Sequence, residues 1–212
     1  LTNTNFLRDN KYYNSNVTAT GINLVDKSNT WTLSASGATS RQYFRGGEHT
    51  GESLTDPGYT YSIATGKSGG NFQFGLSHSL MNQNFDANDV GLTLSNNYMD
   101  HGAGVSYNIY EPFWILREVY NTFRTSISQN YISKHISDFS LGYSMNGTFK
   151  NYLSFWFGME YQAYQGYDYY EPRIDGLYYR SQQNAGGHLG FSSDYRKAFA
   201  LDGEISYYLE PY

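Results

Sequence analysis

Hydrophobic and polar residues alternate along much of the chain, most clearly between Val119 and Gln165. In residues 139–149 every second position except Gly147 is large and apolar, and small or polar residues lie between them. The apolar positions are Phe139, Leu141, Tyr143, Met145 and Phe149. Successive side chains of a β-strand point to opposite faces, so this period of two predicts a strand with one apolar face. Residues 153–161 repeat the pattern, and Lys150 with Asn151 between the two runs predicts a hairpin.

The same alternation predicts ten strands in the whole chain. They cover residues 16–25, 30–38, 58–65, 71–80, 98–109, 119–131, 139–149, 152–163, 186–194 and 201–209. Residues 1–15 are polar and rich in Asn, and they receive no assignment. Several of the ten strands are longer than the five or six residues, roughly, of an ordinary strand. A length of about nine to eleven residues suits a tilted membrane crossing.

Short and long connections alternate between these strands. Residues 26–29, 66–70, 150–151 and 195–200 are short connections, whereas 39–57, 81–97 and 164–185 are long and 110–118 is intermediate. Residues 132–138 are brief where the alternation requires a long loop. Outer-membrane barrels have tight periplasmic turns at one rim and longer extracellular loops at the other.

The predicted fold is therefore all-β, an antiparallel transmembrane outer-membrane β-barrel of which this chain supplies about ten meandering strands. The apolar faces would contact lipid, and the polar faces would surround a wet lumen. The alternative is a soluble β-sandwich, in which the same apolar face packs on a second sheet.

The direction of the ten strands bears on completeness. With the short turns at the periplasmic rim, the first strand starts and the last strand ends at the extracellular rim, which does not suit a finished single-chain barrel. We therefore expect at least one further strand at each end. Residues 1–212 are expected to be a single barrel domain that is a portion of a longer chain.

Tyr and Trp residues gather near the ends of the predicted strands. They are Trp31, Tyr98, Trp114, Tyr131, Tyr152, Tyr161 and Tyr164. In a membrane barrel such residues form girdles at the two interfaces. Ordinary packing at strand ends is the alternative.

Composition and charge narrow the class further. The chain has 23 Tyr, 13 Phe and 22 Gly against 4 Pro, and its charged fraction of 16% lies below the roughly 25% of typical soluble domains. Without Cys, disulfides and Cys-based chemistry are excluded. A net charge of −5 without Lys or Arg clusters argues against nucleic acid as a partner. The mean hydropathy of −0.61 is compatible with a membrane barrel, because only every second strand residue faces lipid.

One segment offers candidate ligand-binding residues. YDYYEPR at residues 167–173 places Asp168, Glu171 and Arg173 among aromatic rings in the longest predicted extracellular loop. Carboxylates beside aromatic rings suit sugar binding or glycoside cleavage, although the second positioned carboxylate of a hydrolase is not apparent. A local contact between Glu171 and Arg173 is the simpler interpretation.

Other polar clusters predict no catalytic or metal site and no cofactor. FDANDVG at residues 85–91 lacks the closing Glu of an EF-hand, and Asx-turns explain its carboxylates more simply. The five His residues, 49, 78, 101, 135 and 188, show no paired spacing or HExxH motif, and no GxSxG motif is present.

Several segments together resemble a known family. They are FDANDVG at 85–91, YNIYEPFW at 107–114, YDYYEPR at 167–173, YYR at 178–180 and SSDYRKAFALDGEISYY at 192–208. This order resembles, over roughly residues 58–208, the C-terminal barrel of a Bacteroidota outer-membrane family. That family pairs a family-9-like carbohydrate-binding module at the N-terminus with a barrel domain of unknown function.

The resemblance implies a Gram-negative outer membrane, with membrane lipid around the barrel and a link to glycans through the missing module. It carries over no catalytic residue. We expect a non-enzymatic pore or scaffold, in glycan-related uptake or as a subunit with other envelope proteins. The alternative is a carbohydrate-active hydrolase with its site in the extracellular loops.

Overall fold

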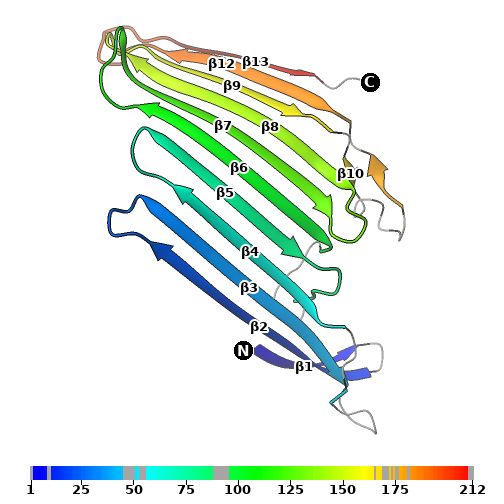
Figure 1. Ribbon diagram of the computed structural model, residues 1–212. Coiled ribbons are helices and arrows are strands. Elements are labelled where there is room, and N and C mark those ends of the chain that lie inside the picture. The colour runs from blue at the N-terminus through cyan, green and yellow to red at the C-terminus, as the bar shows by residue number, and fades with distance from the viewer. Residues whose placement is uncertain are drawn as a thin grey trace.

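The computed structural model describes residues 2–8, 11–44, 51–52, 56–87, 96–164, 166–168, 172, 174, 177–180 and 182–209. These residues form one large antiparallel sheet of 11 strands and a small sheet of two (Figure 1). The strands are β1 (Thr2–Arg8), β2 (Lys11–Val25), β3 (Trp31–Phe44), β4 (Gly58–Lys67), β5 (Phe72–Met81), β6 (Tyr98–Ile109), β7 (Leu116–Asn130), β8 (Ile136–Phe149), β9 (Ser154–Gln162), β10 (Tyr167–Asp168), β11 (Tyr179–Arg180), β12 (Asn184–Ser192) and β13 (Asp202–Leu209). In the large sheet each strand pairs with its neighbours in the chain, and β10 with β11 forms the small sheet. All ten predicted strands are confirmed.

The register gives the large sheet two unlike faces, named here the apolar face and the polar face. A row of paired residues on the apolar face runs through Leu33, Thr65, Leu76, Ala103, Thr125, Leu141 and Tyr161. The adjacent row on the polar face runs through Ser34, Ala64, Ser77, Gly102, Ser126, Ser140 and Gln162. Residues of the same kind therefore alternate along each strand and align in rows across neighbouring strands.

Neither face is covered by a second layer of the described chain. Among the residues that the structure describes, the buried hydrophobic side chains are Leu80, Phe85 and Val119. The accessible surface is 14349 Å², whereas a compact protein of this mass exposes about 10,000 Å². The second sheet required by the sandwich alternative does not occur in the described ranges, and no helix there is able to cross a membrane.

The connections separate into two rims. Residues 26–30, 68–71, 110–115, 150–153 and 193–201 lie at one end of the sheet, which we call the short-turn rim (upper left in Figure 1). Residues 9–10, 45–57, 82–97, 131–135 and 163–183 join strands at the opposite end, the long-loop rim. The brief connection before β8 lies on the rim opposite Lys150, because β7, β8 and β9 are successive antiparallel neighbours. The predicted sorting of loops holds in part: the connections 45–57, 82–97 and 163–183 are long, but 9–10 and 131–135 on the same rim are short.

Three predicted boundaries differ from the structure. The strand expected at 30–38 continues to Phe44 as β3, because its backbone pairs with β2 over that length. The segment left unassigned forms β1 and the first part of β2, since backbone pairing extends there without an apolar alternation in the sequence. The expected strand at 152–163 begins only at Ser154, because Tyr152 has a φ of 64° and belongs to the turn. Its N–H donates to the Phe149 carbonyl at 2.9 Å, and Phe149 N–H donates to the Leu153 carbonyl at 2.8 Å.

The sheet remains open. In the described part of the chain β1 pairs with β2 alone and β13 with β12 alone, so the predicted closure into a barrel is not found within these residues.

Candidate functional site

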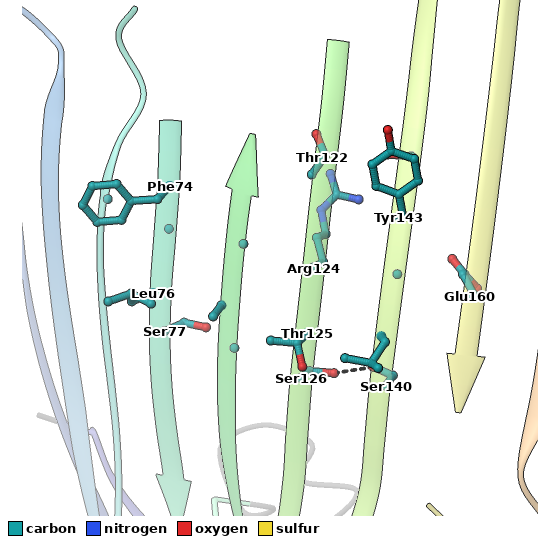
Figure 2. Close-up of a pocket in the computed structure, with 18 of the residues that line it drawn as sticks. Phe74, Leu76, Ser77, Thr122, Arg124, Thr125, Ser126, Ser140, Tyr143 and Glu160 are labelled. Atoms are coloured by element: carbon teal, nitrogen blue, oxygen red, sulfur yellow. Dashed lines mark hydrogen bonds between the residues drawn. The ribbon is translucent and has the colours of Figure 1, made fainter. Parts of the chain in front are cut away.

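A groove of about 780 Å³ lies along the polar face and reaches from Thr32 in β3 to His188 in β12. Figure 2 shows Ser77, Ser126 and Ser140 in its wall. A flat sheet has no such hollow, so the groove results from the curvature of the sheet together with the small size of its side chains.

Glycines at the floor of the groove leave open space because they have no side chains. A Cβ atom added to Gly75 would meet no heavy atom within 4 Å, and one added to Gly142 would meet only the Met159 carbonyl oxygen at 3.9 Å. Between these glycines the walls carry hydroxyl groups. The Oγ atoms of Ser126 and Ser140 are 2.6 Å apart (dashed in Figure 2). The floor is therefore polar, and it has space for water or a solute.

Opposite charges stand on the two sides of one of these glycines. Arg124 in β7 pairs with Gly142 in β8, which pairs in turn with Glu160 in β9. Both charged side chains are exposed, and Figure 2 shows them on either side of β8. Two strand spacings place their backbones about 10 Å apart. The groove is therefore electrically polarised across its width at this point.

Bulky side chains near the C-terminal edge occupy space left by glycines on the next strand. Trp156 in β9 lies over Gly190 in β12, and its Nε1–H donates to Glu204 Oε2 in β13 at 2.8 Å. The His188 ring lies over Gly158 in the same way. These contacts link three strands across the polar face and narrow the groove there.

The start of the connection between β5 and β6 folds over β3 and β4. Asn82 Oδ1 accepts a hydrogen bond from Tyr59 N–H at 2.8 Å, and Ser40 Oγ accepts one from Asp86 N–H at 2.9 Å. Phe85 is 6% exposed beneath this segment. Asp86, one of the carboxylates considered for calcium, is thus placed by its backbone, and its neighbours Asn88 and Asp89 lie outside the described residues.

The predicted ligand-binding residues are only partly placed. The Asp168 backbone pairs with Tyr179 between β10 and β11, whereas Glu171 and Arg173 lie outside the described residues. Tyr167 reaches the connection before β8, with ring centroids of Tyr167 and His135 6.4 Å apart. This part of the loop therefore lies at the long-loop rim, and the predicted sugar site and the hydrolase alternative stay predictions.

A row of four polar side chains in contact lies on the apolar face, and the sequence did not predict it. His78 in β5 and His101 in β6 are directly paired, with their Nδ1 atoms 3.2 Å apart. Tyr61 Oη lies 3.1 Å from His78 Nε2, and Gln129 Nε2 lies 3.3 Å from His101 Nε2. The two imidazoles meet because of the register between β5 and β6. The long connection between those strands means that this register cannot be predicted from the sequence spacing of the two His residues.

An ionic cluster stabilises the short-turn rim. Asp194 accepts hydrogen bonds from Arg196 Nε at 2.8 Å and Nη2 at 2.9 Å, and these bonds lower the pKa of Asp194 to about 2. The Arg196 guanidinium carbon lies 3.4 Å from the Tyr152 ring centroid. Hydrogen bonding to Arg196 also lowers the pKa of Tyr152. The cluster joins the turn after β8 to the turn after β12, and its role is structural.

The fold and the groove define an all-β protein built as a single antiparallel sheet with one apolar and one polar face. A family model described as "Domain of unknown function (DUF5916)" matches residues 1–210. The chain therefore belongs to this family. The sequence resemblance is confirmed only in that the family is a domain of unknown function. No curated protein and no solved structure matches the chain. The Bacteroidota origin and the accompanying carbohydrate-binding module stay predictions.

Proposed function

We propose that this chain forms the wall of an outer-membrane β-barrel that acts as a non-enzymatic pore or scaffold. The observation that carries the proposal is the position of the exposed large hydrophobic side chains. In the part of the large sheet whose side chains the structure describes, they lie on the apolar face, with Val25 and Tyr208 as the exceptions. Leu76 is 51% exposed and Ile205 is 70% exposed. Lipid would cover this face and remove its contact with water.

The dimensions of the apolar face support the same proposal. The apolar alternation of β8 runs from Phe139 to Phe149, which corresponds to about 34 Å along the strand. At the tilt of about 45° that is usual in membrane barrels, this length spans about 24 Å, close to the roughly 25 Å of an apolar barrel belt. Tyr and Trp residues lie at both rims, among them Trp31 and Tyr152 at the short-turn rim and Tyr98 and Tyr131 at the long-loop rim.

The polar face is suited to a wet lumen. Its groove has a floor of glycine and hydroxyl side chains, with Arg124 and Glu160 on opposite sides of Gly142. Charged side chains that project into a lumen set the ion preference of a pore. The free edges of β1 and β13 would pair with further strands of the same barrel. Glycan-related uptake and association with other envelope proteins belong to the proposal on the strength of the sequence resemblance alone.

The chain lends itself to a direct test, because it contains no Cys. Single cysteines at Leu76, Val105 and Phe123 on the apolar face, and at Ser77 and Ser126 on the polar face, would each carry a spin label. In membranes of cells expressing the full-length protein, apolar-face labels should relax with lipid-soluble oxygen. Polar-face labels should relax with a water-soluble nickel complex.

The paired positions Leu76 and Ser77 control for depth, because they are neighbours on opposite faces of β5. Equal access of the nickel complex to both faces, in a protein that stays in solution without detergent, would sink the membrane proposal and favour a soluble binding sheet.

A further inference from the structure

Two imidazoles face each other on the apolar face close to the long-loop rim. His78 and His101 are paired across β5 and β6, their Nδ1 atoms are 3.2 Å apart and their ring centroids 4.6 Å apart. Both lie three positions from the rim ends of their strands, which are Met81 and Tyr98. The His101 side chain is exposed. The pair is therefore accessible from the rim.

The outer nitrogen of each ring is held by a neighbour. His78 Nε2 lies 3.1 Å from Tyr61 Oη, and His101 Nε2 lies 3.3 Å from the Gln129 amide. Histidines that bind metals use one ring nitrogen for the metal and give the other N–H to a polar partner, which fixes the ring. Tyr61 and Gln129 stand in the positions of such partners, and the two Nδ1 atoms are left facing the same point.

We propose that His78 and His101 form a two-histidine clamp for a divalent transition metal of the zinc or copper type. An ion held at the usual 2.0–2.1 Å or so from both Nδ1 atoms would make an angle of about 103° with them. That angle lies between the values of about 90° and 109° of square-planar and tetrahedral sites. Imidazole nitrogen suits these metals, whereas calcium and magnesium take oxygen ligands.

The remaining coordination positions are filled by water that reaches the pair from the long-loop rim, even where lipid covers the rest of the apolar face. No group of three or more His, Asp or Glu side chains gathers in the described part of the chain. The residues that flank the pair in its own row are Ile63 in β4 and Ile127 in β7. Neither is a ligand, so the site has two protein ligands and is open on one side. Cu²⁺ should bind more tightly than Zn²⁺, because copper leads the affinity order for nitrogen ligands.

The protons balance without a further group. In the metal-free pair one Nδ1–H donates to the other Nδ1. In the metal-bound pair both rings carry their proton on Nε2, where His78 donates to Tyr61 Oη. The Gln129 amide nitrogen faces His101 Nε2 in the structure, so this amide must turn over for its carbonyl oxygen to accept from His101. Two neutral rings thus bind the ion with no net proton release.

The site would act as a staple. It ties β5 to β6 at the point where the chain leaves for the connection 82–97, and bound metal would restrain that connection. The inference goes beyond the proposed function and does not depend on it, because the two rings are neighbours in the register of the sheet whatever covers the apolar face.

The test uses the full-length protein, purified in detergent through a tag that contains no histidine. One Cu²⁺ per chain should bind with an electron paramagnetic resonance spectrum split by two imidazole nitrogens. His78→Ala and His101→Ala should each remove that spectrum. His188→Ala is the matched control, because this ring lies on the polar face over Gly158, and it should leave the spectrum unchanged. Tyr61→Phe should weaken binding, by up to about tenfold, through the lost ring partner.

Circular dichroism of each variant checks that the sheet has formed. Should an alanine variant fail to fold, His78→Gln and His101→Gln replace it, since they keep a polar side chain at the position. Binding of Cu²⁺ that persists in folded His78 or His101 variants would overturn the proposal, as would a wild-type protein that binds neither Cu²⁺ nor Zn²⁺ at that pair. Neither result bears on whether the sheet lies in a membrane.

Discussion

At the scale of single residues, the polar face is organised by exchanges of volume between neighbouring strands. Trp156 lies in the space that Gly190 leaves, and from there it reaches Glu204. Gly75 and Gly142 leave space that no side chain fills. An aromatic ring over a cross-strand glycine shields its backbone and restores packing. Some glycines of the sheet thus make room for a neighbouring aromatic ring, and others leave open space in the groove. Substitution of one glycine of each kind distinguishes these two roles.

Gly190→Val should destabilise the sheet, because the new Cβ overlaps the Trp156 ring and the hydrogen bond to Glu204 is lost. Overpacking of this kind costs about 1–3 kcal/mol. Gly75→Val is the control, since its Cβ enters open space and valine favours strands. Urea unfolding in detergent micelles, followed by tryptophan fluorescence, measures both. Equal midpoints for the two variants would show that Trp156 does not depend on Gly190.

Asp26 should make the turn after β2 sensitive to acid. Its carboxylate accepts hydrogen bonds from Ser28, from Trp31 N–H at 2.8 Å and from Thr30 N–H at 2.6 Å, and chiefly the Ser28 bond lowers its pKa from 3.8 to about 2. A carboxyl whose pKa is lower in the folded state stabilises it above the unfolded pKa. That contribution should be complete above about pH 4 and lost as pH falls towards 2. Asp26→Asn should flatten the dependence of the urea midpoint on pH across this window, and an unchanged slope would contradict the assignment.

At the scale of elements, the strands and their rims were predictable and the site was not. Alternation between apolar and polar residues located β2 to β9, β12 and β13, because one face of each strand carries most of its large apolar side chains. It missed β1, where Thr2–Arg8 shows no apolar side. The groove depends on the curvature of many strands together. The contact of His78 with His101 depends on the register between two strands that are 16 residues apart in the sequence. Neither quantity is local in sequence.

The middle of β8 should control passage along the groove if the sheet lines a pore. Gly142→Phe places a ring between Arg124 and Glu160, and its Cβ meets only the Met159 carbonyl oxygen at 3.9 Å, so the strand itself is undisturbed. Conductance of the full-length protein in planar bilayers should fall, with the same insertion frequency as wild type. Met145→Phe, on the apolar face of the same strand and outside the residues that line the groove, is the control. Equal conductance for Gly142→Phe and wild type would remove the groove from the conducting path.

At the scale of the whole molecule, the solvent-accessible surface is much larger than that of a compact protein of the same mass. The chain exposes 14349 Å² where about 10,000 Å² is usual for its mass, and within the described residues β1 and β13 each pair with a strand on one side only. The proposed function sets a requirement for this sheet, namely an apolar medium on one side, water on the other and partners for its edges. The spin-label comparison of Leu76 with Ser77 tests this requirement directly, since one strand reports on both media.

The strictly sequential order of strands has a kinetic consequence. Each strand pairs with its neighbour in the chain, so the entropy lost in closing each loop is set by one connection. Residues 82–97 form a connection about four times longer than 68–71, which adds about 1.2 kcal/mol to closure. Hairpins at the short-turn rim should therefore nucleate first and join afterwards in pairs. Because the closure cost grows with the logarithm of length, lengthening the turn at 68–71 slows folding more than an equal insertion within 82–97.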